Sequence, residues 1–407
     1  MKFAPKKSTP NLSMGIVGLP NIGKSHLFNV LTESEIRTEN FAFCTIDPNR
    51  ANAAKPDEKY DNLVKFAKPV KGVPNYLKVI DIAGLIKNAH SGAGLGNSFL
   101  DNILNVDGIF QVVRCFKEKD VVHVENDINP ANDIETINNE LRMKDLQLVR
   151  GLIEKFEKDN RAKKLEKKAQ AHINCLKKMA SVLNFSWLNF QWKKSTGIEK
   201  SCEFDVFKNV VENGGWTNEE ISIINKERLL TVKEVVYLAN LSDADYESKK
   251  GKLFSKAVKY LAASSDIPEY KEIEGLEKLK RKSTIIPFCF SKIPPNLIQA
   301  GYDALDLITF YTVGKVEVRA WTCQKNTTAP DAAGLIHSDF RDYFISVDVY
   351  NYDDINIQVE GDNATGLKEA DLKAKGLIKN KGKDYIIKDG DIVKFKSNPP
   401  KGGKNKK

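Results

Sequence analysis

Residues 14–31 of the chain read MGIVGLPNIGKSHLFNVL. A short apolar run at 14–17 leads into the spacing G-x-x-x-x-G-K-S at 18–25, and an apolar-periodic segment follows at 26–31. This order of strand, glycine-rich loop and helix is typical of a phosphate-binding loop. The two glycines permit backbone torsions that turn several N–H groups toward one anion, and the positive end of the following helix attracts phosphate. These residues therefore predict a site for a nucleoside triphosphate.

The composition predicts a soluble, globular, cytosolic protein. The chain has 407 residues, enough for two or three domains, and 41% of them are hydrophobic and 29% charged. No run approaches the roughly eighteen apolar residues of a membrane-spanning helix, and the N-terminus lacks the apolar segment of a secretory signal. The six cysteines show no C-x-x-C spacing, which argues against a zinc site or a disulfide framework and favours reduced thiols.

The charge distribution leaves two interpretations open. The formal net charge is +9, and lysines are crowded within residues 155–178 and 401–407. Clustered positive charge of this kind is compatible with contact to RNA or to a ribosome. The alternative is a solvated helix face together with a disordered tail.

The order of the apolar runs predicts an α/β fold. Runs with the character of buried strands lie at 14–17, 76–84, 108–114, 235–240 and 285–290. Because strands alternate with helical or loop segments, we expect a parallel sheet that is covered on both faces. Ligands of such sheets bind at the carboxyl ends of the strands, where Gly18 and Asp81 are expected to lie.

Two later regions differ in pattern from the first. Between about residues 133 and 225, apolar residues recur at helical spacing among many charges, which predicts two long antiparallel helices inserted into the first domain. From about residue 308 onward the pattern predicts a small α+β domain with strands at 317–322, 344–349, 385–387 and 391–395. Residues 388–391 read KDGD, a signal for a tight hairpin turn between the last two of these strands.

These patterns predict four regions along the chain. They are a nucleotide-binding domain at 1–132 and 228–306, a helical insertion at 133–227, a C-terminal domain at 307–397 and a basic disordered tail at 398–407.

Three residues are suited to the phosphates and their metal ion. Lys24 is placed to reach the outer phosphates, and Ser25 is placed to bind Mg²⁺. Thr45 lies twenty residues beyond Ser25, a distance that suits a second Mg²⁺ ligand on a mobile switch loop.

Two further motifs occur in the order found in GTPases. In the run DIAG, Asp81 suits the metal-side carboxylate and Gly84 suits the glycine whose N–H contacts the γ-phosphate. Residues 240–243 read NLSD directly after a predicted strand, where a GTPase carries N-K-x-D to read guanine. In this interpretation Asn240, Leu241 and Asp243 would lie beside the base.

Longer motifs along the chain resemble the Obg-like ATPase (YchF) family. The motifs are GLPNIGKS at 18–25, NFAFCTI at 40–46, AGLIKNAH at 83–90, GLGN at 94–97, HVE at 123–125, DIE at 133–135, FYTVG at 310–314, EVRAWT at 317–322 and TAPDAAGLIHSDF at 328–340. The last of these resembles the C-terminal TGS domain of that family, which is a β-grasp module. The resemblance covers nearly the whole chain and is weakest in the helical insertion and across residues 353–381.

The resemblance implies a Ras-like (OBG-type) phosphate-loop NTPase domain with an inserted helical coiled-coil domain and a C-terminal β-grasp (TGS) domain. It also implies a cytoplasmic monomer that hydrolyses ATP in preference to GTP, requires Mg²⁺ and associates with ribosomes, with roles in translation and stress responses. Carried over by position, the phosphates are cradled by Asn21, Ile22, Gly23, Lys24, Ser25 and His26. Ser25 and Thr45 would bind Mg²⁺, and Leu241 would meet the base through its backbone.

Two positions depart from the family pattern. His26 stands where the family usually carries threonine, and we expect its side chain to be packed or solvated. Asp243 stands where the family typically carries glutamate, and in a GTPase an aspartate here accepts hydrogen bonds from guanine. The lysine that packs under guanine in GTPases is replaced by Leu241. The resemblance therefore favours ATP, while the local chemistry leaves GTP open.

The group that supports hydrolysis is not given by the usual motif. Leu85 follows the DIAG run where many GTPases place a water-orienting glutamine, and an alkyl side chain cannot hydrogen-bond water. His90, in a glycine-rich loop, is the candidate catalytic residue, with a surface or hinge role as the alternative. Asn21 is either a ligand that helps to hold K⁺ between phosphates or a turn-forming residue.

A different class of function also fits the sequence. The chain could be a nucleotide-gated binding module in which hydrolysis is incidental. Nucleotide-dependent binding together with ribosome-dependent turnover would separate a switch ATPase from such a module.

Overall fold

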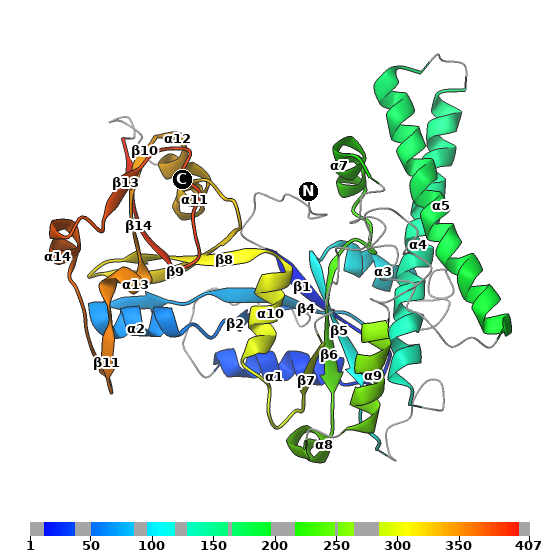
Figure 1. The fold of residues 1–407 in the computed structure, drawn as a ribbon, viewed down its shortest axis with the longest axis horizontal. Helices are drawn as coiled ribbons and strands as arrows, with labels where there is room; N and C mark the ends of the chain where they lie inside the picture. Colours follow the sequence, from blue (N-terminus) through cyan, green and yellow to red (C-terminus); the bar gives the residue numbers. More distant parts are fainter. Residues whose placement is uncertain are drawn as a thin grey trace. The chain divides into compact units, whose positions relative to one another are not determined.

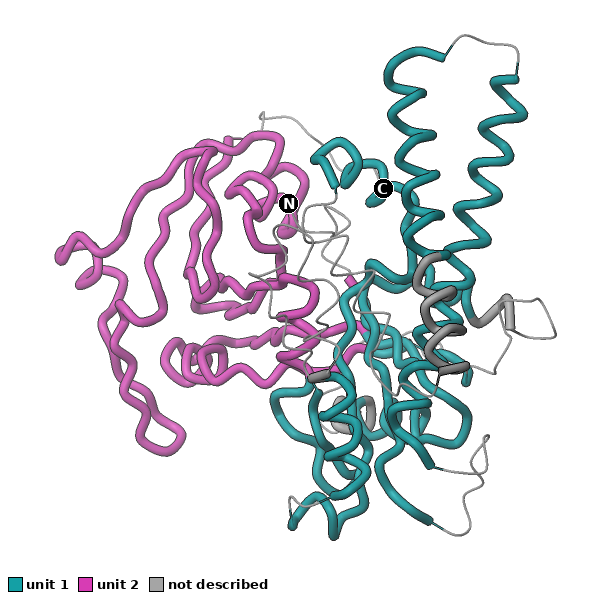
Figure 2. The backbone as a smooth tube through the Cα atoms, turned by 45° about the vertical axis from the view of Figure 1, so that its right-hand side comes forward, with its two compact units in different colours: residues 1–6, 13–51, 79–297 teal, residues 7–12, 52–78, 298–407 magenta. Residues whose placement is uncertain are grey.

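The computed structural model of the chain describes residues 12–36, 50–84, 96–118, 128–161, 165–196, 216–248, 251–263 and 285–398. These residues form two compact units, shown in teal and magenta in Figure 2. Unit 1 takes the described residues within 13–51 and 79–297, and unit 2 takes those within 52–78 and 298–407, with Leu12. A segment from the first fifth of the chain thus belongs to the same unit as the C-terminal part.

The first sheet has the α/β architecture that the sequence predicts, although its strand at Arg50–Ala54 was not among the predicted strands. Its six strands are ordered β2-β4-β1-β5-β6-β7, and β1, β5, β6 and β7 pair in parallel (Figure 1). The strands are β2 (Arg50–Ala54), β4 (Tyr76–Asp81), β1 (Ser13–Val17), β5 (Gly108–Arg114), β6 (Glu234–Asn240) and β7 (Ile285–Phe288). Every residue of β1 and β5 is buried, as expected for central strands of a parallel sheet that is covered on both faces. The carboxyl ends of β1, β6 and β7 consequently lie at one edge of the sheet.

Several of the described helices follow these strands along the chain, and four of them lie in unit 1 outside the helical insertion. They are α1 (Lys24–Ile36), α3 (Gly96–Leu104), α8 (Asp243–Ser248) and α9 (Lys252–Ala263). Helix α9 packs through Ala257 and Leu261 against a core that includes Val113, Tyr237 and Ala239 from β5 and β6. Helix α9, which follows β6 along the chain, therefore covers apolar side chains of the central strands β5 and β6.

The helical insertion contains two long neighbouring helices. Helices α4 (Pro130–Asp159) and α5 (Lys167–Thr196) each have 30 residues and lie side by side in Figures 1 and 2. Pro130 occupies the first turn of α4, where its missing N–H costs no helical hydrogen bond. Helix α7 (Asn218–Glu227) begins with a capping box formed by Thr217 and Glu220. The helical spacing in the sequence thus reports real helices, with α4 starting three residues earlier than the predicted insertion.

A buried carboxylate fixes α4 to the segment that enters β6. The Asp145 carboxylate accepts hydrogen bonds from Leu230 N (2.9 Å), Thr231 N (2.8 Å) and Thr231 Oγ1 (2.6 Å). Burial raises the pKa of Asp145 to about 6, because the loss of solvation outweighs the three donors, which act in the opposite direction.

The second sheet is mixed and belongs to unit 2. Its six strands are ordered β13-β10-β14-β8-β9-β3, with β14 and β8 parallel to each other. The strands are β13 (Lys379–Lys381), β10 (Phe344–Asn351), β14 (Asp391–Ser397), β8 (Leu307–Val313), β9 (Glu317–Gln324) and β3 (Lys71–Val73), and β11 (Gln358–Glu360) pairs with β12 (Asn363–Thr365) in a separate small sheet.

Short helices accompany this sheet. They are α10 (Asn296–Ala304), α11 (Ala329–Ile336), α12 (Ser338–Asp342), α13 (Tyr352–Ile355) and α14 (Glu369–Ala374). Helix α11 places Ala329, Ala332 and Ala333 in one core with Phe310 and Val393. A mixed sheet with a helix packed on it is the arrangement expected of a β-grasp domain.

Residues 52–78 complete unit 2 rather than unit 1. Strand β3 pairs in parallel with β9, from Lys71 opposite Glu317 to Val73 opposite Arg319. Helix α2 (Glu58–Ala67) buries Tyr60 and Leu63 in a core that also contains Tyr311, Val318 and Ile355. Local sequence pattern gives no signal of this assignment, because β3 has only three residues and its partner lies more than two hundred residues away.

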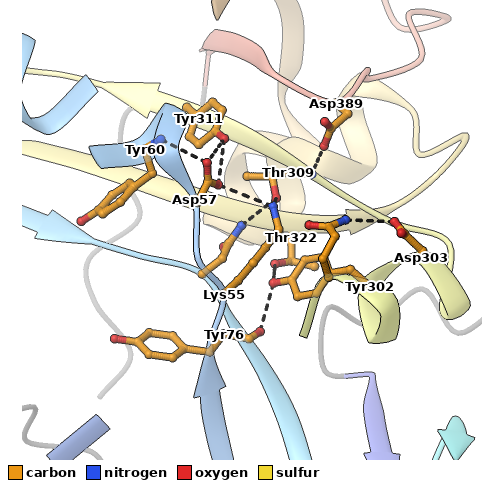
Figure 3. A network of polar contacts seen from close by, with 12 residues as sticks. Lys55, Asp57, Tyr60, Tyr76, Tyr302, Asp303, Thr309, Tyr311, Thr322 and Asp389 are labelled. Atoms are coloured by element: carbon orange, nitrogen blue, oxygen red, sulfur yellow. Dashed lines mark hydrogen bonds and ion pairs between the residues drawn. The ribbon is translucent and has the colours of Figure 1, made fainter. Parts of the chain in front are cut away.

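A buried polar network lies under this segment (Figure 3). Tyr311 donates its hydroxyl to Asp57, at 2.9 and 2.8 Å from the two carboxylate oxygens, and Asp57 also caps α2 by accepting from Tyr60 N at 3.1 Å. Lys55 Nζ lies 3.6 Å from Asp57 Oδ2 and donates to Thr309 Oγ1 at 3.2 Å. Burial and the Asp57 charge raise the pKa of Tyr311 well above its usual range, so the hydroxyl stays a donor.

One predicted hairpin is wrong. Residues 385–387 do not form a strand beside β14; Ile386 makes an isolated bridge to Thr328, and Ile387 N donates to Thr327 O at 3.0 Å. Residues 388–391 do form a turn, closed by Asp391 N donating to Lys388 O at 3.2 Å. Both aspartates of the turn accept hydrogen bonds at 2.8 Å. Asp391 accepts one from the nearby Tyr385 OH, and Asp389 accepts one from Thr309 N in β8. These side-chain bonds replace the strand pairing that the sequence suggests.

Four of the six cysteines lie in the described residues, and all four are buried. Cys115, Cys175, Cys289 and Cys323 are free thiols, and burial raises the pKa of Cys115, Cys175 and Cys323 to about 12. Within the described ranges no helix has both the length and the apolar character needed to span a bilayer. The two other cysteines and residues 399–407 of the predicted tail lie outside the described residues.

Replacing Asp57 by asparagine tests whether the buried network stabilises the protein. We expect Asp57→Asn to lower the free energy of unfolding by about 2–4 kcal/mol, because Lys55 loses its countercharge while it stays largely buried. Asp303→Asn is the matched control, since Asp303 is exposed and its carboxylate accepts a hydrogen bond from Gln299 at 2.9 Å. Denaturant unfolding followed by circular dichroism measures both variants, and equal small losses would show that the network contributes nothing.

The raised pKa of Asp145 predicts a pH-dependent stability. Its pKa is about 6 in the folded protein against an ordinary value of 3.8, so the folded state holds this proton more tightly than the unfolded chain. This tighter proton binding adds up to about 3 kcal/mol to the free energy of unfolding below about pH 4. The added stability is lost as the pH rises through 6. The unfolding free energy of the wild type minus that of Asp145→Asn should therefore fall between pH 4 and pH 7. A difference that is constant over this interval contradicts the assignment.

Candidate nucleotide-binding site

The loop between β1 and α1 has the backbone of a phosphate-binding loop. Asn21 and Gly23 adopt φ values of +60° and +96°, in the left-handed region. A Cβ atom on Gly23 would lie 2.5 Å from Phe290 Cζ and 2.8 Å from Asn240 Nδ2, and one on Gly18 would collide with the Ile22 side chain and approach Val112 O to 2.9 Å. Both glycines of the motif are therefore required by close approach, and Gly23 also by its torsion.

Lys24 is held inside this loop. Its side chain is 7% exposed, and Nζ donates to Leu19 O at 2.7 Å. Burial lowers the pKa of Lys24 to about 8, and the nearby Asp81 carboxylate opposes this shift. An ammonium group held this way, with few solvent contacts, is placed to gain strongly from an incoming phosphate.

Ser25 and Asp81 are brought together from α1 and the end of β4. The Ser25 hydroxyl hydrogen-bonds the Asp81 carboxylate, and burial raises the pKa of that carboxyl while Ser25 and Lys24 act to lower it. Asp81 Oδ1 is buried and receives no hydrogen bond within the described part of the chain. A hydroxyl beside a carboxylate with a spare oxygen is the donor set that a Mg²⁺ ion bound mainly by phosphates requires. These residues fit the ion.

The end of β6 is tied to the phosphate loop and to β7. Asn240 Nδ2 donates to Ile22 O at 3.0 Å, and Leu241 N donates to Phe288 O at 2.9 Å. The Leu241 side chain is 5% exposed and belongs to the core with Ala257 and Leu261. Its N–H is therefore not available to a base, and its side chain does not replace the lysine that lies under guanine in GTPases.

Asp243 is oriented by the residues that follow β7. Ser291 Oγ donates to Asp243 Oδ1 at 2.7 Å, and hydrogen bonds from Ser291 and Cys289 lower the pKa of this exposed carboxyl. One oxygen of the carboxylate is thus already bound by a neighbouring loop.

The structure gathers most of the predicted residues at one end of the first sheet. Asn21, Ile22, Gly23, Lys24, Ser25 and His26 lie on the loop and the first turn of α1, and Asp81, Asn240, Leu241 and Asp243 lie at or just beyond strand ends. Gly84 is close as well, since a Cβ on it would lie 3.0 Å from Pro20 N. Thr45, Leu85 and His90 lie outside the described residues, so their predicted roles stay predictions.

Sequence reasoning missed two residues of this site. Phe290 and Ser291 follow β7, and the sequence interpretation took residues 285–290 only as a further strand. Their position directly after a parallel strand was the available signal, because the carboxyl ends of such strands carry ligand sites.

Comparison with known proteins agrees with this geometry. The family described as "50S ribosome-binding GTPase" matches residues 13–155, and the YchF GTPase C-terminal family, described as a protein of unknown function, matches residues 307–398. The chain is 41% identical over 405 residues to Obg-like ATPase 1 of Homo sapiens and 40% identical over 411 residues to that of Danio rerio, with 97% of this chain and 95% of each relative covered.

A solved structure shows the same fold. The Schizosaccharomyces pombe YchF GTPase superposes with a TM-score of 0.74 at 33% identity, covering 95% of this chain and 98% of that one. The phosphate loop, the paired Ser25 and Asp81, and relatives of this similarity over nearly the full length lead to one conclusion: the chain belongs to the Obg-like ATPase (YchF) family of phosphate-loop nucleotide hydrolases.

Proposed function

We propose that this protein is a Mg²⁺-dependent ATPase that prefers ATP to GTP and acts as a nucleotide-state switch on ribosomes. The observation that carries the base preference is the similarity, over nearly the full length of the chain, to relatives named Obg-like ATPase 1. Guanine recognition by an aspartate uses both carboxylate oxygens, one for N1–H and one for the exocyclic amine. Ser291 occupies one acceptor site of Asp243 Oδ1 and leaves the other acceptor sites of the carboxylate open, so this contact orients Asp243 and does not by itself decide between the two bases.

Asn240 supports the same preference. Its Nδ2 is committed to Ile22 O, which leaves Oδ1 as the group that faces away from that bond, and Oδ1 is buried with no donor among the described residues. Adenine offers an exocyclic amine as donor where guanine offers a carbonyl acceptor. An unsatisfied acceptor therefore suits adenine better than guanine.

In this proposal Ser25 and Asp81 hold Mg²⁺, with Thr45 as a further ligand from the switch loop. The ion supplies neutralisation of charge on the transferred phosphoryl group. Lys24 binds the outer phosphates, and His90 orients the attacking water. Asn21, which lies in the loop with its backbone in the left-handed region, is the candidate ligand for K⁺ between phosphates.

The ribosome is the proposed partner, and the description of the family that matches residues 13–155 supports it. The basic helix α5 and the C-terminal domain are the regions proposed to make the contact, because lysines are concentrated in and near α5. A cytoplasmic location and roles in translation and stress responses are proposed because the chain resembles the Obg-like ATPase family. The alternative is a nucleotide-gated binding module. In that case the same surfaces would bind the partner, and hydrolysis of the nucleotide would be incidental.

Calorimetric titration of the Mg²⁺-loaded protein with non-hydrolysable ATP and GTP analogues tests the base preference. We expect at least tenfold tighter binding of the ATP analogue. Ser291→Ala removes the hydrogen bond that orients Asp243 and should weaken binding of the GTP analogue severalfold while leaving the ATP analogue unchanged. Lys292→Ala is the control, since Lys292 pairs only with the exposed Glu247 at 3.4 Å in the described structure and should alter neither affinity. Tighter binding of the GTP analogue to the wild type would make the protein a GTPase.

Co-sedimentation with ribosomes tests the switch. We expect the ATP-analogue form and the ADP form to differ at least fivefold in the fraction bound at limiting ribosome concentration, and ribosomes to raise the turnover rate. The non-catalytic module predicts nucleotide-dependent binding with unchanged turnover. Binding that is indifferent to nucleotide would contradict both.

A further inference from the structure

Two aromatic rings meet beside the phosphate loop. The ring centroids of His26 and Phe290 are 4.0 Å apart, with planes inclined at 50°. His26 is the third residue of α1 and is exposed, and Phe290 is half-buried two residues beyond the end of β7. Phe288 supports Phe290 edge-on at 5.7 Å, so the outer ring has a fixed base beneath it.

Phe290 is also packed directly on the phosphate loop. A Cβ on Gly23 would lie 2.5 Å from Phe290 Cζ and 3.2 Å from Phe290 Cε2, so no side chain fits between the ring and the loop backbone. The next residue, Ser291, binds Asp243 in the loop that faces the base. One short run after β7 therefore touches both the phosphate side and the base side of the site.

The path of a bound nucleotide follows from these two contacts. Its phosphates occupy the loop at 18–25, and its base lies by Asn240 and Asp243, so the sugar and the inner phosphate must cross the space between them. The His26–Phe290 pair joins the first turn of α1, where the inner phosphates are cradled, to the run that orients Asp243.

The geometry points to the His26–Phe290 ring pair as a wall of the site that positions the sugar and inner phosphate of the bound nucleotide. Both are positioning residues. Phe290 offers an apolar face to the sugar carbons, and His26 holds that ring in place from the helix. The pair acts as one unit, because each ring is ordered against the other. This inference rests on nucleotide binding and is independent of which base is preferred.

The test compares a nucleotide with its phosphates alone. Phe290→Ala should weaken binding of the non-hydrolysable ATP analogue about five- to tenfold and leave the affinity for Mg²⁺–tripolyphosphate within twofold of the wild type. If Phe290 only supports the phosphate loop, both affinities fall together, and that result overturns the proposal. The ratio of ATP-analogue to GTP-analogue affinity should stay constant, so a failure of the base preference would not be mistaken for a failure of the wall.

A double-mutant cycle tests the coupling of the rings. His26→Ala should show the same selective loss as Phe290→Ala, and the double variant should lose no more than about twofold beyond either single variant. Fully additive losses would mean that the two rings act separately, against the proposal. Melting temperatures of the variants within a few degrees of the wild type establish that each is folded.

A conservative variant gives a direct readout of contact. Phe290→Trp should restore binding of the ATP analogue and report it, because the new indole emission, taken as the difference from the wild type, should change on nucleotide addition and stay constant with tripolyphosphate. If the indole emission does not change at saturating nucleotide, the sugar does not contact residue 290, and the proposal is wrong.

Discussion

The hydrogen bond from the Asn240 amide to the Ile22 carbonyl is the constraint on which the nucleotide site depends. It joins the end of β6 to a loop that follows β1, although β5 lies between these strands in the sheet. The bond is buried, so its loss would leave a polar pair without water to replace it. Because Leu241 is in turn bonded to Phe288, the same constraint reaches β7 and fixes the loop that carries Phe290 and Ser291. Three chain segments that are distant in sequence thus keep one geometry before any ligand arrives.

Sequence pattern predicted the parts of this site whose chemistry is local. The glycines at 18 and 23 and the strand at 108–114 follow from short-range rules, because torsion and burial are properties of a few neighbouring residues. The two long helices follow from their spacing in the same way. Ser291 and Phe290 were missed, because an isolated serine or phenylalanine after a strand carries no motif, and only the packing of strand ends places them beside Asp243 and His26.

The largest difference between expectation and structure concerns residues 52–78. In sequence, the segment lies between two parts of the nucleotide domain. In the structure, β3 pairs with β9 in the second sheet, and Asp57 accepts a hydrogen bond from the Tyr311 hydroxyl. Residues 385–387 were misjudged for a related reason. Their three consecutive residues Tyr-Ile-Ile are typical of a strand. However, Asp389 accepts a hydrogen bond from Thr309 and Asp391 accepts one from Tyr385, and such side-chain bonds have no periodicity to detect. The features that the sequence pattern did not predict have one property in common: they depend on buried polar contacts between residues far apart in the sequence.

The membership of residues 52–78 in unit 2 also bears on how the protein is made. Lys55 and Thr309 are 254 positions apart, and Asp57 and Tyr311 are separated by the same number. A ribosome that synthesises the chain from its N-terminus releases Tyr60 and Leu63 long before Val318 and Ile355 exist to cover them. At roughly 5–20 residues per second this interval lasts on the order of ten seconds or more, during which an apolar helix face and an unpaired short strand are open to solvent. Unit 2 therefore cannot be completed until its C-terminal residues have been synthesised, and the sheet and core contacts of residues 52–78 form only then.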